Sequence, residues 1–556
     1  GLTVFRDEEF SADQRSRAVE RIGDVRALRS HQFVEDAGPL AHPVRPEVYH
    51  EINNFYTTTV YDKGGEVVRM IKVLLGADIF RKGMDLYFTR HDGEAATVEQ
   101  FIQCFADVSG RDFSQFMLWY TQAGTPEIRV APHYDARAKT FRLDLTQTVP
   151  PTPGQPEKAP MLIPLSVGLV GQNGADLPLM IDGKVLPRNV IDLSQPGQSF
   201  VFTGVAERPI LSLNRGFSAP VRLILPIEPN DLRFLATHDC DPFNRWQAAQ
   251  TLAMSLLTAN VAALRGGTPT GGIDGLTAAL GTVLSDATLE PAFVALTLTP
   301  PSENDIAREI GRDIDPEAIF VARRNLRVAI GRSLAGALAE KYRQMMTPGP
   351  YRPDAASAGR RSLKNVCLDL MTASEDDQPI TLAFSQYQSA DNMTDRMAAL
   401  ETLALHDRPE RAQALEDFYA TYQGDPLIID KWLALQAAIP EPGTLDRVRA
   451  LTAHPAFSMA NPNRVRALIG SFAQVNHTQF NRPDGAGYDF VADTVLALDP
   501  KNPQVAARLM GAFRSWRVLE PRRRERAEAT LRRVATVPSL SRDVTDIVAR
   551  TLAAEG

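Results

Sequence analysis

Cysteine is scarce in this sequence and is never paired in a motif. Cys104, Cys240 and Cys367 lie far apart, and no C-x-x-C occurs. Neither a disulfide framework nor a thiolate metal site is therefore suggested. Such cysteine usage is typical of a reducing compartment.

Long apolar runs and an excess of basic residues are also missing. No apolar run approaches the roughly 20 residues that a membrane-spanning helix needs, so no membrane partner is expected. The 60 Lys and Arg against 67 Asp and Glu give a formal net charge of −7. A nucleic-acid partner would need a clustered basic face, which this balance does not indicate. The content of 44% hydrophobic and 23% charged residues is ordinary for a soluble globular protein, and the length allows several domains.

Complete catalytic motifs are absent as well. HEINN at 50–54 begins like the zinc motif H-E-x-x-H, but Asn54 stands where the second histidine would be. Two imidazoles therefore cannot share one helical face there. The other histidines are solitary, and no G-x-S-x-G, Walker loop or dinucleotide fingerprint occurs. By its motifs alone, the chain holds no complete catalytic constellation.

Hydrophobic periodicity divides the chain into three zones. Residues 1–124 predict helices with irregular connections. Residues 125–228 change to a two-residue alternation, interrupted by a Pro-rich exposed connection at 150–160, and predict a small antiparallel β-sandwich. Residues 229–556 predict short amphipathic helices, several of which begin at Asp or Asn. This last zone resembles a helical solenoid, although it has no strict repeat period.

Individual segments carry these predictions. The opening GLTVFRDEEF spaces its apolar residues like the buried stripe of a helix, and 112–120 predicts another apolar helix. A helix over 61–76 is expected to end at Gly76 as its C-cap. Its buried stripe would comprise Val67, Met70, Ile71, Leu74 and Leu75. The inward residues of two strands would be Phe141, Leu143 and Leu145 in one, and Val221, Leu223, Leu225 and Ile227 in the other.

Several stretches together resemble one family. They occur in order along the whole chain: GLTVFRDEEFS, NNFYTTTVYDKGGEVVRM, YFTRHDGEAAT, WYTQAGTP, DNMTDRMAAL, DKW and MANPNRVRALIGSFA. They are similar to bacterial aminopeptidase N, a family of zinc-dependent gluzincin aminopeptidases. The resemblance implies a multidomain α+β protein. Its parts would be the C-terminal part of a thermolysin-like, mainly helical catalytic domain (1–124), the β-sandwich (125–228) and a large all-α domain that caps the active site (229–556).

The resemblance implies that the zinc ligands lie outside this chain. Family members carry an H-E-x-x-H helix and, eighteen residues later, a Glu that is followed directly by Gly-Leu-Thr-Val or a close variant. The third ligand is therefore expected immediately before Gly1, with the two His ligands, the general-base Glu and a G-x-M-E-N motif further upstream. Zinc catalysis needs three protein ligands and an open position for water. The chain alone is thus expected to bind no catalytic Zn²⁺ and to be inactive.

The resemblance also assigns roles within the chain. Tyr61 aligns with the catalytic tyrosine of the family, whose phenolic O–H stabilises the oxyanion together with the metal. From the residues alone, packing near a helix start would be the more common assignment for a tyrosine. Asp7 lies about two helical turns after the expected third ligand and would accept the second N–H of a zinc-bound imidazole. A solvated acid in the RDEE run is the alternative.

Four further residues are expected to contact substrate. Tyr56 and Asn53, about one and two turns before Tyr61 if the segment is helical, would line the same cleft, although ordinary packing explains them equally well. Arg466 and Arg508 resemble family arginines that project into the internal cavity, where a guanidinium can meet the carboxylate of a short peptide. A solvated helix face is the alternative for both.

The full-length protein is accordingly expected to be a cytoplasmic, monomeric zinc aminopeptidase that hydrolyses N-terminal residues from short peptides. The resemblance implies metal-bound water as the nucleophile, activated by the upstream Glu, and the missing N-terminal part of the same polypeptide as the partner of this chain. A preference for basic and apolar first residues is implied by the family only. The alternative is a non-enzymatic scaffold, in which a β-sandwich and a helical solenoid present a binding surface. Tyr61 within its motif favours the enzyme.

Overall fold

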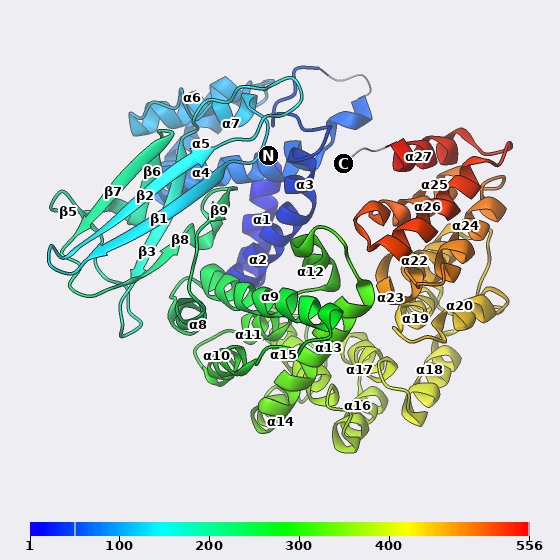
Figure 1. The fold of residues 1–556 in the computed structure, drawn as a ribbon. Coiled ribbons are helices and arrows are strands. Elements are labelled where there is room, and N and C mark those ends of the chain that lie inside the picture. Colours follow the sequence, from blue (N-terminus) through cyan, green and yellow to red (C-terminus); the bar gives the residue numbers. More distant parts are fainter. Residues whose placement is uncertain (49–51, 554–556) are drawn as a thin grey trace. The chain divides into compact units, whose positions relative to one another are not determined.

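The structure, a computed structural model, describes residues 1–48 and 52–553, apart from the side chain of Asn53. Within these residues the chain forms two compact units (Figure 1). The first unit comprises Gly1–Leu252, Ala278–Thr297 and Asp354–Ala356, and the second comprises Ala253–Thr277, Leu298–Pro353 and Ser357–Gly556.

The first part of the first unit is mainly helical, as predicted. Its α-helices are α1 (Leu2–Gln14), α2 (Arg17–Ala27), α3 (Phe33–Asp36), α4 (Gly64–Leu75), α5 (Ala77–His91), α6 (Val98–Ser109) and α7 (Leu118–Thr121). Three short segments have other helical geometries: the π-helical η1 (Leu28–Gln32) and η3 (Thr59–Lys63), and the 3₁₀-helical η2 (Ile52–Phe55).

Helix α4 confirms its predicted stripe and C-cap. Its five predicted core residues are at most 5% exposed. Gly76 ends the helix with a φ of +80°, a conformation that glycine adopts without a Cβ penalty.

Helix α1 differs from its predicted apolar stripe at Phe10. Phe5 is 4% exposed, but Phe10 is 65% exposed. Five residues turn an α-helix by about 140° beyond a full turn, so these two rings face different directions. The buried stripe of α1 therefore does not include Phe10.

The helix predicted over 112–120 is mostly wrong. Only α7 is α-helical, and turns precede it. The Asp112 carboxylate accepts hydrogen bonds from the backbone N–H (2.8 Å) and the hydroxyl (2.5 Å) of Ser114. An Asp that bonds the backbone two residues on forms an Asx turn, and here further turns at 114–117 follow it before α7 begins.

A β-sandwich of two sheets follows, as predicted. Its strands are β1 (Glu127–Asp135), β2 (Thr140–Thr148), β3 (Ile163–Val170), β4 (Met180–Ile181), β5 (Lys184–Val185), β6 (Val190–Leu193), β7 (Gly197–Thr203), β8 (Ile210–Leu213) and β9 (Arg222–Ile224). They form a six-stranded sheet in the order β5-β4-β7-β2-β1-β9 and a three-stranded sheet in the order β6-β3-β8. Short 3₁₀ turns interrupt the strands at η4 (Pro187–Asn189) and η5 (Arg215–Phe217).

The predicted alternation holds in β2, where Phe141, Leu143 and Leu145 are at most 3% exposed. Strand β9 is shorter than predicted and pairs with β1 in parallel, unlike the antiparallel pairs β1–β2 and β2–β7. Pro226 follows two residues after its end and has no N–H for a ladder.

One hydrophobic core joins the helices to the sandwich within the first unit. It runs from Ile71 on α4 through Trp119 on α7 to Leu143 on β2 and Leu165 on β3. The Trp119 indole N–H donates to the carbonyl of Leu162 at 2.8 Å. A buried indole is thereby satisfied, which keeps the cost of its burial low.

Four helices follow the sandwich in sequence: α8 (Pro229–His238), α9 (Pro242–Gly266), α10 (Asp274–Ser285) and α11 (Pro291–Leu298).

The remaining helices form most of the second unit. They are α12 (Glu303–Ile310), α13 (Pro316–Ser333), α14 (Ala335–Gln344), α15 (Ala355–Thr372), α16 (Asp377–Ser389), α17 (Met393–Ala404), α18 (Pro409–Tyr422), α19 (Pro426–Ala438), α20 (Thr444–Thr452), α21 (Pro462–Val465), α22 (Ser471–Val475), α23 (His477–Phe480), α24 (Ala486–Leu498), α25 (Pro503–Met510), α26 (Pro521–Ala535) and α27 (Arg542–Ala553). Three shorter turns are η6 (Arg466–Gly470), η7 (Gly511–Phe513) and η8 (Trp516–Val518).

Consecutive helices of this unit pack on one another, which agrees with the predicted solenoid: α16 on α17, α17 on α18, α18 on α19 and α19 on α20. Asp and Asn begin several helices, as predicted: the side chains of Asp241 and Asn392 accept backbone N–H groups in the first turns of α9 and α17. Asp315 and Asp425 cap α13 and α19 in the same way, at positions that were not predicted. Among the residues that the structure covers, no helix is both long and apolar enough to cross a membrane.

Candidate active site

Glycines allow α1 and α4 to approach closely. A Cβ placed on Gly64 would lie 3.1 Å from Cα and 3.5 Å from N of Gly1, and one on Gly65 would lie 3.1 Å from Cγ1 of Val4. Larger side chains would push the two helices apart. The Gly1 nitrogen therefore lies beside the first residues of α4, which directly follow the π-helical turn η3.

Turn η3 carries Tyr61. Its backbone N–H donates to the carbonyl of Thr57 at 3.1 Å, and its side chain is 44% exposed. The Tyr61 hydroxyl has no hydrogen-bond partner among residues 1–48 and 52–553. An exposed phenol without an internal partner is available to a bound molecule.

Tyr56 lies next to Tyr61, with 6.2 Å between the ring centroids and 59% of Tyr56 exposed. The segment from Asn53 to Tyr61 is not one helix: η2 ends at Phe55, and Tyr56 and Thr57 link it to the next helical turn. Asn53 belongs to η2, and its side chain is outside the described part of the structure. The prediction that Asn53, Tyr56 and Tyr61 are spaced along one helix is thus wrong, although the two tyrosine rings are neighbours.

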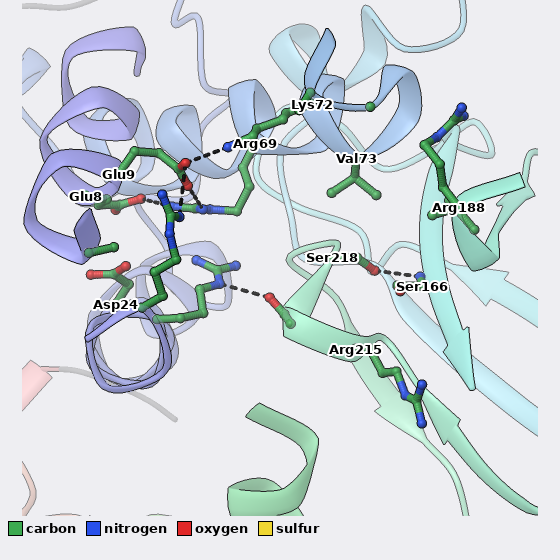
Figure 2. A pocket seen from close by; sticks show the side chains of 17 residues that line it. Glu8, Glu9, Asp24, Arg69, Lys72, Val73, Ser166, Arg188, Arg215 and Ser218 are labelled. Atoms are coloured by element: carbon green, nitrogen blue, oxygen red, sulfur yellow. Dashed lines mark hydrogen bonds and ion pairs between the residues drawn. The ribbon is translucent and has the colours of Figure 1, made fainter. Parts of the chain in front are cut away.

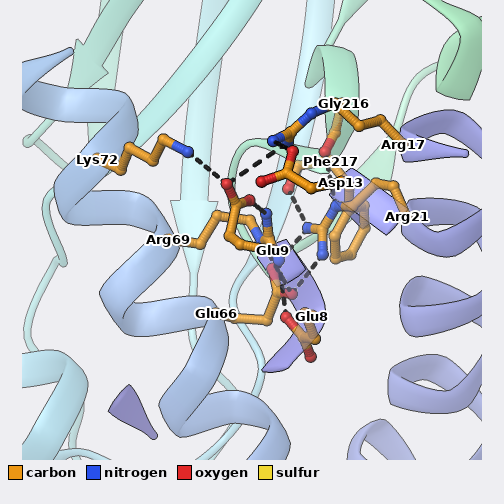
Figure 3. A network of polar contacts seen from close by, with 10 residues as sticks. All are labelled: Glu8, Glu9, Asp13, Arg17, Arg21, Glu66, Arg69, Lys72, Gly216 and Phe217. Carbon is orange, nitrogen blue, oxygen red and sulfur yellow. Dashed lines mark hydrogen bonds and ion pairs between the residues drawn. The ribbon is translucent and has the colours of Figure 1, made fainter. Parts of the chain in front are cut away.

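Asp7 is exposed on α1 and makes no ion pair with a described residue. The next two residues point elsewhere. Glu8 and Glu9 face α4, where Arg69 donates to Glu8 and to Glu9 at 2.7 Å each and Lys72 donates to Glu9 at 2.5 Å. Figure 3 shows this network. The RDEE run is therefore only partly solvated.

A second part of the network joins α2, α4 and the sandwich. The Arg21 guanidinium donates to both carboxylate oxygens of Glu66, at 2.5 and 2.7 Å, and to the carbonyls of Gly216 and Phe217 in η5, at 2.9 Å each (Figure 3). Glu66 is only 2% exposed. Burial alone would raise its pKa, but the charges of Arg21 and Arg69 and the hydrogen bonds from Arg21 together outweigh burial and lower it. Such bidentate pairs fix geometry as well as charge.

Glu8, Glu9, Arg21, Arg69 and Lys72 line a cavity of about 430 Å³ between the helices and the sandwich (Figure 2). Burial, with the nearby charges of Glu66 and Asp24, raises the pKa of Glu8 to about 7 despite its bonds to Arg69. Burial also raises the pKa of Asp24 to about 6. Glu8 and Asp24 therefore titrate close to neutral pH, whereas the pKa of Glu9 is lowered, because the charges and hydrogen bonds of Lys72 and Arg69 together outweigh its burial.

The sequence analysis missed this network. One signal was available, because Glu66 stands next to the apolar residues Val67 and Val68 of α4 and a buried carboxylate requires a cationic partner. The identity of that partner was not accessible, since Arg21 is 45 positions away in sequence.

Arg466 and Arg508 belong to the second unit and are both exposed there. Arg466 lies in the π-helical turn η6 and donates to the side chain of Asn463 at 2.7 Å, and Arg508 lies on α25. The Arg-rich run at 521–526 includes one buried residue. Arg523 is 6% exposed and donates to the carbonyl of Asn481 at 2.7 Å.

The residues that the structure describes do not form a zinc site. Across the described ranges, no group of three or more His, Cys, Asp and Glu side chains is arranged to hold a metal ion. His50 of HEINN lies outside those ranges. The three cysteines are described and free. A structural or catalytic zinc needs three or four such ligands.

Three domain families match successive parts of the chain. Residues 1–120 match the Peptidase family M1 domain, residues 124–226 match an Ig-like domain of unknown function (DUF3458), and residues 229–553 match a domain of unknown function with ARM repeats (DUF3458_C).

Whole-chain similarity agrees with these matches. Aminopeptidase N of Caulobacter vibrioides is 45% identical over 99% of this chain, and aminopeptidase N of Escherichia coli is 40% identical over 100% of it. The chain spans 63% of the length of each of these relatives.

A solved structure is similar in fold. Aminopeptidase A of Legionella pneumophila, determined in complex with aspartic acid, superposes with a TM-score of 0.79 and 27% identity, over 99% of this chain and 62% of that one. Since the ARM-repeat match alone covers more than half of the chain, the chain belongs to the DUF3458_C family; it is similar over nearly its whole length to bacterial aminopeptidase N, and its first 120 residues match the Peptidase family M1 domain.

Proposed function

We propose that the full-length protein is a zinc aminopeptidase that removes N-terminal residues from short peptides, and that Tyr61 stabilises the oxyanion. The observation that carries this proposal is the position of Tyr61. It is exposed, its hydroxyl is free of described partners, and its turn lies directly before the helix that packs against Gly1.

Hydrolysis of a peptide bond builds negative charge on the carbonyl oxygen. A phenol remains protonated at neutral pH and can donate a hydrogen bond to that oxygen. Such a donor is most effective when it stabilises charge that exists only in the transition state, and removing one typically costs about 10²- to 10³-fold in kcat. Tyr61 would supply this donor.

The zinc ligands are assigned to the segment that the relatives have beyond the 63% spanned by this chain. When bound, zinc would activate water and polarise the carbonyl. A residue joined to the Gly1 nitrogen would lie beside the start of α4, close to the turn of Tyr61. This proximity supports the assignment of the third ligand to that position.

The other predicted residues keep their proposed roles. Tyr56 and Asn53 would line the cleft beside Tyr61, and Asp7 would accept the N–H of a metal-bound imidazole. Arg466 and Arg508 would bind the carboxylate of a short peptide. Division into domains at 1–124, 125–228 and 229–556, a monomeric state and a cytoplasmic location remain predictions.

Metal content and turnover of two proteins test the proposal. The full-length protein should bind one zinc and release the first residue of an aminoacyl p-nitroanilide, whereas the 556-residue chain should bind none tightly and be inactive. Tightly bound stoichiometric zinc in the 556-residue chain would show that the ligands are misplaced. A full-length protein without zinc-dependent turnover would contradict the enzyme assignment and leave the scaffold alternative.

A further inference from the structure

Two consecutive acids at the end of α3 hold both ends of the turn that carries Tyr61. The Glu35 carboxylate holds its beginning: it accepts the backbone N–H of Thr59 at 3.0 Å, the Thr59 hydroxyl at 2.5 Å and the Thr58 hydroxyl at 3.0 Å. Three donors from two adjacent residues therefore converge on one carboxylate. Charge-assisted bonds of this kind are shorter and stronger than neutral ones.

Asp36 holds the end of the same turn. Its carboxylate accepts the Lys63 ammonium at 2.8 Å and the Thr125 hydroxyl at 2.9 Å. The ammonium also donates to the carbonyl of Gly124 at 2.9 Å. The end of η3 is thereby joined to the segment that leads into β1.

The backbone between these two anchors is π-helical. The preceding π-helical turn, η1, packs against it, and Gln32 of η1 donates to the Thr59 hydroxyl at 3.3 Å. π-Helical turns are rare and occur frequently at functional sites. One extra residue per turn changes the direction in which a side chain leaves the backbone, so the geometry of η3 decides where the Tyr61 ring points.

The two anchors differ in burial. The Lys63 and Asp36 side chains are each 1% exposed, as expected of an ion pair that stabilises the fold. The Glu35 side chain is 23% exposed, and its Oε1 lies 3.6 Å from Nε2 of His42, a contact that is an ion pair only when the imidazole is protonated. Glu35 thus organises the turn from a partly solvated position, where a substitution is less damaging to the fold than at Asp36.

We propose that Glu35 is a positioning residue for Tyr61, setting the direction of the phenol by holding Thr58 and Thr59. This inference rests on the proposed function, since it assumes that Tyr61 acts on the reacting carbonyl. Glu35 itself contacts the turn and has no part in the chemistry. A displaced donor loses its effect in the transition state, and a shift of about 1 Å can cost about 10²-fold.

The test compares Glu35→Gln, Tyr61→Phe and the double variant in the full-length protein. Glu35→Gln should lower kcat about tenfold or more, with KM within about twofold, because it disturbs an interaction made only in the transition state. In the Tyr61→Phe background the same substitution should have no further effect on kcat, since its action passes through the missing hydroxyl.

Glu157→Gln serves as the matched control, because Glu157 is exposed in the same unit and has no described contact. It should leave kcat unchanged. Zinc content and thermal unfolding temperature are measured for each variant. Should Glu35→Gln fail to fold, Thr58→Val removes one of the three donors with less disturbance, and it should show the same dependence on Tyr61.

The outcomes separate the two proposals. If Tyr61→Phe does not reduce turnover, the proposed function fails, and the positioning role fails with it. If Tyr61→Phe reduces turnover but Glu35→Gln leaves kcat unchanged, only the positioning role is wrong. An equal loss of kcat from Glu35→Gln in both backgrounds would also overturn it, because it would indicate a general structural effect.

Discussion

At the scale of single residues, stability depends on charged side chains that are buried away from water. Lys63 and Asp36 form an ion pair at 2.8 Å with both side chains 1% exposed. Burial alone would raise the pKa of Asp36, but the Lys63 charge and hydrogen bonds outweigh it and lower the pKa. The pair is therefore ionised at neutral pH, and each partner depends on the other.

Asp36→Asn should lower the free energy of unfolding of the first unit by about 3 kcal/mol, because it leaves an uncompensated buried ammonium. Urea unfolding of the chain measures this loss. Asp78→Asn is the control, since Asp78 is exposed on α5, and it should change stability by less than about 0.5 kcal/mol. Equal stability of the two variants would show that the buried pair contributes nothing.

Glu8 should make stability depend on pH. Its pKa rises from 4.5 to about 7 on folding, so between these values the folded state binds a proton that the unfolded state has released. Stability is therefore lost as pH rises through this window. The Glu8→Gln variant has no carboxyl group at this position to titrate. The unfolding temperature of the variant minus that of the unsubstituted chain should therefore be larger at pH 8 than at pH 5. A difference that is the same at both pH values would contradict the raised pKa.

At the scale of elements, close contacts between helices depend on single glycines. A Cβ on Gly83 of α5 would lie 2.3 Å from Cδ1 of Phe105, whose ring is buried on α6 and stacks on Phe80 at 5.2 Å. By contrast, Gly23 of α2 has open space around its Cβ position.

Gly83→Ala should therefore destabilise the chain by about 1–3 kcal/mol through overpacking, despite the better helix propensity of alanine. Gly23→Ala should stabilise it by about 0.5–1 kcal/mol for the same propensity reason. Urea unfolding of both variants measures the contrast. If both substitutions stabilise the chain, then α5 and α6 pack less tightly against each other than they do in the structure.

Helices and strands could be predicted where neighbouring residues in the sequence determine them. The apolar stripe of α4, the alternation of β2 and the Asp and Asn helix starts all follow from neighbouring residues, and the structure confirms them. The helix over 112–120 was predicted from its apolar residues, but turns precede the short α7 there. The π-helical geometry of η3 was not predictable, because Glu35, 24 positions earlier, holds its first residue.

The sequence supplied candidate residues for the site but not their surroundings. Tyr61 and Tyr56 were singled out by their motif, and the structure brings their rings together. The Arg21–Glu66 pair joins distant segments, and only the fold reveals such partners. Sequence spacing therefore identifies candidates, whereas tertiary contacts show how they are held.

At the scale of the whole molecule, the helical second unit is proposed to act on substrate through Arg466 and Arg508. Each guanidinium is exposed and able to bind a carboxylate. In the full-length protein, Arg466→Ala and Arg508→Ala should each raise KM about tenfold for a tripeptide with a free carboxylate, as a lost charged hydrogen bond implies. The same peptide with an amidated C-terminus is the control and should show an unchanged KM. Equal effects on both peptides would exclude carboxylate binding.

The measurement that bears most directly on the enzyme proposal is the turnover of full-length Tyr61→Phe. The substitution removes one hydroxyl from an exposed ring, so folding and zinc content should match those of the unsubstituted protein. We predict that kcat for an aminoacyl p-nitroanilide falls by about 10²-fold or more while KM changes little. Unchanged kcat in a folded, zinc-loaded variant would contradict the role of Tyr61 as the oxyanion donor.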